Sequence, residues 1–273
     1  MTIDLTTLWD FHKPELSEER FRAALANAST DDAFILQIQI ARTYGLRRNF
    51  AQAQAILADL EPQLQSAGIE ARARYYLELG RTYSSATHSP ESQTPEVRER
   101  ARAAYRRATE LAEEGNLDSL AIDALHMMTF VDTAPEEQIA WNRKAMAAME
   151  SSSAPEAKKW EGTLHNNTGY ALHQVGKYDE ALAEFQLALA AHERSGNPQN
   201  IRIAHWMIAW TLRALGQLQD ALAIQLRLEK EWDDAGEPDP YVFEELELLY
   251  QALHDQEKAE FYAARRRATT STP

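Results

Sequence analysis

Residues 164–189 read LHNNTGYALHQVGKYDEALAEFQLAL, which is two helical patterns joined by the turn sequence GKYDE. Gly169 in the first pattern and Ala181 in the second have almost no side chain, so two antiparallel helices can approach closely at these positions. Tyr178 and Phe185 are expected to fill the space beside that contact. The stretch therefore predicts a helical hairpin with a close crossing.

A spacing of twelve residues between the two crossing positions recurs along the chain, and self-similarity at such a period indicates a repeat architecture. In one unit the spacing is twenty-one residues, from Gly80 to Ala101, because residues 88–96 are inserted between the helices. This Ser- and Pro-rich insertion predicts a mobile surface loop. The pairs with the regular spacing are Ala41 and Ala53, His126 and Gln138, Gly169 and Ala181, Ala209 and Ala221, and Glu247 and Ala259.

Residues 164–189 resemble the tetratricopeptide repeat, in which a small residue, a turn glycine, an alanine and aromatic residues stand at these places. The units start at intervals longer than the ordinary 34 residues. Long units of about 40 residues with paired asparagines, here Asn166 and Asn167, are similar to those of kinesin light chains and bacterial peptide-sensing regulators.

The repeat pattern and its resemblance imply an all-α fold, a right-handed superhelical α-solenoid of about six antiparallel helix pairs in a single domain over residues 1–273. Residues 1–29 are expected to form an N-terminal cap segment with one helix, and residues 269–273 a tail. The six pairs are predicted at residues 31–68, 70–115, 118–152, 155–196, 198–236 and 239–268.

Glycines and a basic run mark the expected helix ends. Gly68, Gly115, Gly196 and Gly236 are each expected to end a second helix in the left-handed conformation. The run Arg265-Arg266-Arg267 is expected to offset the dipole at the C-terminal end of the last helix.

The charge of the chain excludes some classes of partner. Twenty-eight basic and 42 acidic residues give a net charge of −14, which disfavours nucleic acid and anionic membranes as partners. The chain has no cysteine, no apparent secretory leader and no apolar run long enough to span a membrane. We therefore expect a cytoplasmic protein.

The family resemblance implies that the first helix of each pair lines a concave groove. Aromatic residues and arginines are frequent binding hot spots, and they suggest a peptide with an acidic group or a C-terminal carboxylate. Two alternatives remain open: the tryptophans can equally be packing residues, and any single arginine more often forms a surface ion pair. The candidate groove residues are Arg42, Arg74, Arg81, Asn166, Tyr170, His173, Trp206, Trp210 and Arg213.

Catalytic and metal-binding motifs are missing from the sequence, and so are glycine-rich phosphate loops. We expect no enzymatic activity, no cofactor and no metal.

The resemblance implies a scaffold that binds a protein or peptide of unknown identity. The alternative is a peptide- or small-molecule-sensing regulator that acts by partner sequestration. A homodimer is possible. Chaperone-binding members of the family hold a carboxylate with a lysine and asparagines at set positions of the groove. Ile38 and Arg42 stand at the corresponding places of the first unit, so this carboxylate clamp is disfavoured.

Overall fold

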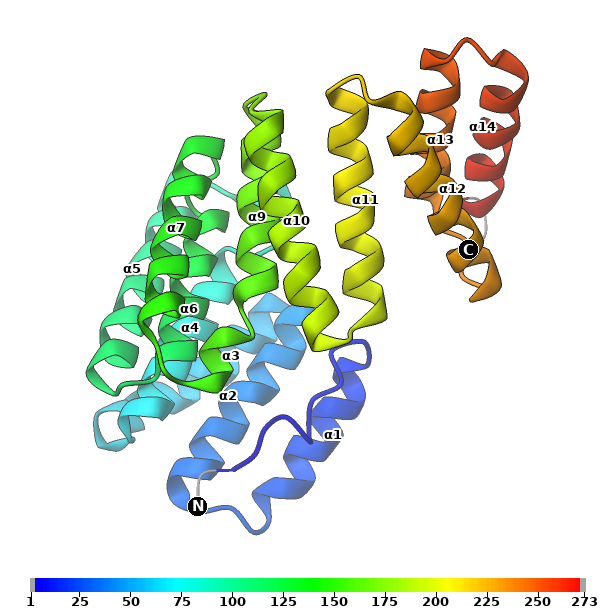
Figure 1. Ribbon diagram of the computed structural model, residues 1–273. Helices are drawn as coiled ribbons and strands as arrows, with labels where there is room; N and C mark the ends of the chain where they lie inside the picture. The colour runs from blue at the N-terminus through cyan, green and yellow to red at the C-terminus, as the bar shows by residue number, and fades with distance from the viewer. Residues whose placement is uncertain (1–2, 271–273) are drawn as a thin grey trace. The chain divides into compact units, whose positions relative to one another are not determined.

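The computed structural model describes residues 3–270, and within this range the chain forms α-helices and short 3-10 helices without a strand (Figure 1). By their contacts the helices fall into two compact units, unit 1 up to Trp160 and unit 2 from Glu161. The single domain over residues 1–273 stays a prediction. Of the expected tail, residues 271–273 lie outside the described residues, and the two before them belong to the last helix.

Unit 1 begins with the cap helix α1, Pro14–Leu25, which packs on α2. Each later helix of unit 1 except the short α8 packs against the next one in chain order. The helices are α2 Thr30–Leu46, α3 Phe50–Leu60, α4 Ile69–Tyr83, α5 Pro95–Glu114, α6 Asp118–Met127, α7 Pro135–Ser151 and α8 Pro155–Lys158, with 3-10 helices η1 Glu61–Ser66, η2 Pro90–Ser92 and η3 Met128–Phe130.

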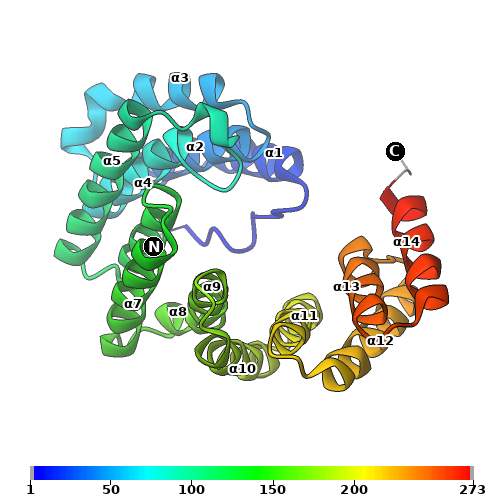
Figure 2. The same ribbon diagram turned by 90° about the horizontal axis from the view of Figure 1, so that it is seen from above.

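Unit 2 is three helix hairpins in succession, and Figure 2 shows its helices side by side in chain order. The two units are therefore built as an all-α solenoid, as predicted. The helices of unit 2 are α9 Glu161–Gln174, α10 Tyr178–Ser195, α11 Pro198–Ala214, α12 Leu218–Asp234, α13 Pro240–Ala252 and α14 Gln256–Thr270.

The four hairpin turns α2–α3, α9–α10, α11–α12 and α13–α14 share one backbone geometry. In each, one residue has φ between 61° and 76°. The amide of the next residue donates to the carbonyl five positions before it, at 2.9–3.0 Å. The left-handed residues are Arg48, Gly176, Gly216 and His254.

Two of the four predicted helix-ending glycines are left-handed. Gly196 and Gly236 have φ of 71° and 73°, as expected. The prediction was wrong for Gly115, whose φ is −86°, because the next residue, Asn116, takes the left-handed conformation that asparagine also tolerates. It was also wrong for Gly68, which has φ of −59° and precedes the first turn of α4.

The predicted close crossings are present in both units. A Cβ atom on Gly169 would lie 2.8 Å from the ring of Phe185, and one on Gly80 would lie 2.4 Å from the ring of Tyr105. Both rings are fully buried. The small residues therefore set how closely the paired helices α9–α10 and α4–α5 pack.

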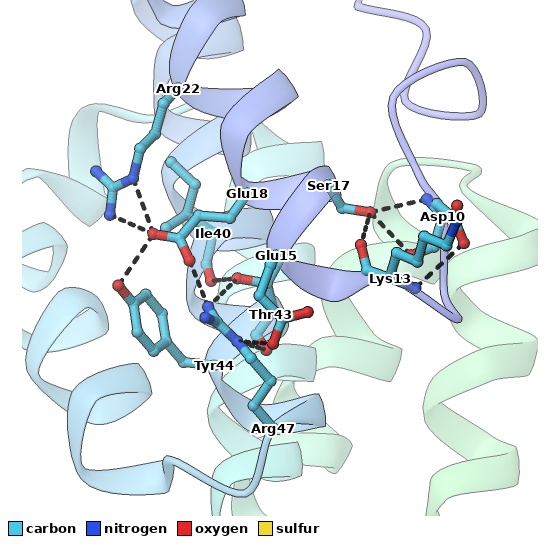
Figure 3. Close-up of polar contacts among 10 residues, drawn as sticks. All are labelled: Asp10, Lys13, Glu15, Ser17, Glu18, Arg22, Ile40, Thr43, Tyr44 and Arg47. Atoms are coloured by element: carbon cyan, nitrogen blue, oxygen red, sulfur yellow. Dashed lines mark hydrogen bonds and ion pairs between the residues drawn. The ribbon is translucent and has the colours of Figure 1, made fainter.

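The cap helix is attached to α2 through one carboxylate (Figure 3). Glu18 accepts hydrogen bonds from Arg22, from the hydroxyl of Tyr44 at 3.0 Å and from Arg47. Ahead of α1, the indole of Trp9 packs edge-on against Phe21. These contacts agree with the expected N-terminal cap.

The inserted segment between α4 and α5 has specific contacts. Gln93 donates to the carbonyl oxygen of Tyr83 at 3.0 Å, and the His88 ring stacks on Phe50 with centroids 3.8 Å apart. The segment lies where the spacing placed it, while its mobility stays a prediction.

The basic run near the C-terminus lies at the end of α14, with Arg267 in its last turn, and its first two members also form ion pairs with neighbouring helices. Arg265 pairs with Glu229 and Asp233 on α12. Arg266 pairs with Glu244 and Glu247 on α13, at 2.9 and 3.1 Å. These arginines therefore link α14 to the preceding helices.

Gly80→Ala is expected to lower the free energy of unfolding by about 1–3 kcal/mol, because the new methyl group overlaps a buried ring. Tyr105 cannot move away easily, since its hydroxyl donates to the carbonyl oxygen of Ser84. Urea unfolding followed by circular dichroism measures the change. The control is Gly45→Ala on α2, where no described atom lies within 4 Å of a new Cβ, and its stability should not fall. Equal effects of the two substitutions would contradict the close crossing.

Candidate functional site

Unit 1 contains a chain of ion pairs that joins α2, α4 and α6. Oε1 of Glu78 accepts hydrogen bonds from Arg42 at 2.9 Å and from Arg81 at 2.5 Å. Arg81 also donates to Asp123 at 2.5 Å. The first helices of three consecutive pairs are thereby connected through charged side chains.

Burial and the neighbouring charges act in opposite directions on these groups. Burial raises the pKa of Asp123, but Arg81 and Arg42 lower it more, so the pKa is below its ordinary value. Burial lowers the pKa of Arg81, but Asp123 and Glu78 raise it above the ordinary value. For Arg42, burial and the nearby Arg81 lower the pKa, although Glu78 and Asp123 oppose them. Arg42 is therefore the less compensated of the two cations.

Most of the predicted groove arginines already have carboxylate partners. Arg74 pairs with Glu70 one turn away on α4 at 2.8 Å and does not join the chain of ion pairs. In unit 2, Arg213 on α11 donates from Nε and Nη2 to both oxygens of Glu245 on α13, each at 2.8 Å. Paired cations of this kind do not by themselves favour an acidic ligand.

The aromatic candidates of unit 2 meet in one place, and we call them the ring row. The centroid of the Trp210 ring lies 3.3 Å from that of His173, 5.9 Å from that of Tyr170 and 5.8 Å from that of Trp206, with interplanar angles of 16–23°. Tyr170 and His173 come from α9, and the two tryptophans come from α11. Four ring planes are therefore nearly parallel over two neighbouring helices.

The ring row contains polar ring atoms but carries no charge at pH 7. Burial, helped by the nearby Arg213, lowers the pKa of His173 to about 4, so its imidazole is neutral at pH 7. The buried Nε2 of His173, Nε1 of Trp206 and Oδ1 of Asn166 have no hydrogen-bond partner among the described residues. Since an unpaired buried polar atom costs about 1–3 kcal/mol, this region is less stable than its packing alone would make it.

Trp206 also lines a pocket of about 390 Å³ in unit 2. Its other walls include Ile203 and Met207 of α11, Trp232 of α12 and Tyr241 at the start of α13. Ile203 and Tyr241 are 41% and 65% exposed, which is unusual for such large apolar groups. The pocket is therefore an accessible, mainly apolar hollow at one end of the ring row.

The structure brings together Arg42 and Arg81 in unit 1, and the ring residues in unit 2. Sequence reasoning missed Glu78 and Glu245 as the partners of these arginines. Their charges are visible in the sequence, but nothing there identifies which of the 42 acidic residues reaches which arginine. It also did not select Trp232, because Trp232 lies on a second helix and the groove was expected to be lined by first helices.

Among the described residues, no group of three or more His, Asp or Glu side chains is arranged to hold a metal ion. None of the described helices combines the length and the apolar character needed to cross a bilayer.

Comparison with known proteins identifies the repeat. Residues 160–229 match the family model of the tetratricopeptide repeat. This segment, which contains helices of unit 2, thus carries the sequence signature of the tetratricopeptide repeat. No similar sequence was found among curated proteins.

Solved structures share this fold along most of the chain. The apo form of RapI superposes with a TM-score of 0.72 at 12% identity, covering 97% of this chain and 73% of that one. Aspartyl phosphate phosphatase F from Bacillus subtilis gives 0.60 at 15% identity, covering 94% and 76%. At these identities the likeness concerns the fold alone.

A third similar structure is a much longer protein. The signal transduction ATPase with numerous domains from Pyrococcus horikoshii, which carries a tetratricopeptide repeat sensor, gives a TM-score of 0.73 at 18% identity. The match covers 96% of this chain but only 39% of that one.

Glu78→Gln is expected to lower the free energy of unfolding by about 3 kcal/mol, because it leaves two partly buried arginines without their shared, buried carboxylate. The Glu78 side chain is 4% exposed. Glu70→Gln is the matched control, since it removes only a partly exposed pair within α4 and should cost less than about 0.5 kcal/mol. Urea unfolding measures both variants. Similar losses would show that the chain of ion pairs does not stabilise unit 1.

The imidazole of His173 should titrate with a pKa of about 4, below its ordinary value of 6.5. Because the folded state disfavours protonation, the stability that depends on neutral His173 is fully present above pH 6.5 and is lost as the pH falls towards 4. Titration of the histidine ring protons by NMR, with His173→Phe to assign the signal, measures this. A pKa near 6.5 would mean that the ring is not enclosed by Trp210.

Proposed function

We propose that the protein is a non-enzymatic scaffold whose unit 2 binds an extended peptide segment of a partner protein along the ring row. The observation that carries this proposal is the set of four nearly parallel rings on α9 and α11, which continues into the apolar pocket beside Trp206.

The ring row offers contact area at low entropic cost. Aromatic side chains have few rotatable bonds, so a partner that covers them loses little side-chain freedom. Tyr170 remains 41% exposed although it stacks on Trp210. A ring with one face supported and the other face open is suited to hold an apolar or aromatic side chain of a peptide.

The pocket beside Trp206 supports a second anchor point. Its volume of about 390 Å³ is enough for one large side chain, and its walls are mainly apolar. Hot spots of binding are typically such pockets filled by one aromatic or aliphatic group. The peptide would place one side chain on the ring row and a neighbouring one in this pocket.

Charge argues against an acidic peptide in unit 2. Arg213, the candidate arginine of unit 2, is held by both oxygens of Glu245. His173 is neutral at pH 7. The recognised segment is therefore defined by apolar and aromatic side chains, with few carboxylates.

The alternative function, a sensing regulator that sequesters its partner, stays a prediction. The cytoplasmic location and the homodimer also stay predictions.

Tyr170→Ala and Trp210→Leu are each expected to weaken peptide binding about tenfold or more, which is the effect of removing one aromatic anchor. Peptides would be selected from a random displayed library on the wild-type protein, and their affinity measured by calorimetry. Leu187→Ala on α10 is the control, because Leu187 is also an exposed large apolar residue but lies outside the ring row, and its loss should leave affinity unchanged.

Two outcomes would contradict the proposal: selection that enriches no peptide, or enriched peptides that bind the two ring variants as tightly as the wild type.

A further inference from the structure

Unit 1 contains a pocket of about 280 Å³ that the ring row does not share. It lies between the first helices α2, α4 and α6 and is closed at one side by residues 85–87, which follow α4 and precede the inserted segment. Charged groups of the ion-pair chain form one part of its wall. Met127, Phe130 and Trp160 form an apolar and aromatic part.

The two arginines in the pocket wall differ in the number of their carboxylate partners. Arg81 has two carboxylate partners, Glu78 and Asp123. Arg42 has one among the described residues, Glu78, and its Nη1 donates to the same oxygen that accepts from Arg81. No described residue accepts a hydrogen bond from Nε of Arg42.

The position of Arg42 is fixed even though its hydrogen bonding is incomplete. Its guanidinium lies 5.6 Å from the ring centroid of Trp9 and 5.4 Å from that of Phe11, so the two stacked rings cover it. A guanidinium that is held in place and has an unused donor can bind a carboxylate without first losing much side-chain freedom. About a quarter of the side chain, 23%, is exposed.

We propose that this pocket binds a carboxylate attached to a small apolar or aromatic body. The carboxylate accepts hydrogen bonds from the Arg42 guanidinium and gives Arg42 a second anionic partner, as Asp123 does for Arg81. The apolar body packs against Met127, Phe130 and Trp160.

Two sources can supply this chemistry: a free small organic acid, or the C-terminal residue of a peptide. The site lies in unit 1 and does not depend on peptide binding by the ring row. Either proposal can therefore fail without the other.

Gly45 makes the pocket testable without disturbing its charges. It lines the pocket, and no described atom lies within 4 Å of a Cβ built on it. Gly45→Leu therefore places a side chain in the hollow at little cost in packing. Arg42→Gln removes the proposed anchor while Arg81 still pairs with Glu78 and Asp123.

The probes are 3-phenylpropionate and its uncharged amide, together with the dipeptide Gly-Phe as the free acid and as the C-terminal amide, measured by calorimetry on the full chain. The wild type should bind at least one acid about tenfold more tightly than the matching amide, because an ionised acceptor makes a stronger hydrogen bond. Gly45→Leu and Arg42→Gln should each weaken that binding about tenfold or more. Arg74→Gln, which removes an arginine outside the pocket, should bind as the wild type does.

Binding of phenylpropionate alone identifies a free acid as the source, and binding of Gly-Phe shows that a peptide C-terminus fits. The proposal is overturned if neither acid binds the wild type, if amides bind as tightly as acids, or if Gly45→Leu binds like the wild type. Circular dichroism of each variant confirms that helicity is retained.

Discussion

The close crossing of paired helices at a residue with almost no side chain is the constraint on which the rest of this structure depends. Where Gly80 faces Tyr105 and Gly169 faces Phe185, the ring occupies the space that a larger side chain would need. The backbones of the two helices can then approach, and each pair presents its first helix at a defined distance from the next pair. The ion pairs and ring contacts described above require that distance, because hydrogen bonds and stacked rings tolerate little displacement.

The same kind of connection between consecutive first helices occurs in both units. Arg42 on α2 reaches Glu78 on α4, and Arg213 on α11 reaches Glu245 on α13. In both cases the carboxylate is almost completely buried, while the arginine keeps part of its side chain exposed. Arginine suits this position because its long apolar stem can be buried while its planar head satisfies a carboxylate. An arginine on the first helix of a pair therefore serves first as a structural link.

The all-α repeat fold was predictable because it follows from a local pattern. Small residues twelve apart act within a few turns of the chain, and the helical hairpins that they predict are observed. The partners of the charged residues were not predictable in this way, since Arg81 and Asp123 are 42 residues apart and meet only after the helices pack. The boundary between the units was also hidden. Trp160 lies inside the expected fourth pair, yet its indole donates to Ser119 in unit 1.

The hairpin turns explain how far sequence comparison can follow this fold. The segment that matches the family model, residues 160–229, contains the two turns in which glycine is the left-handed residue, Gly176 and Gly216. At Arg48 and His254 the backbone takes the same conformation with a residue for which it is strained. A sequence model registers the identity of the turn residue, whereas the fold requires only its φ angle. The hairpin geometry therefore extends further along the chain than the sequence match does.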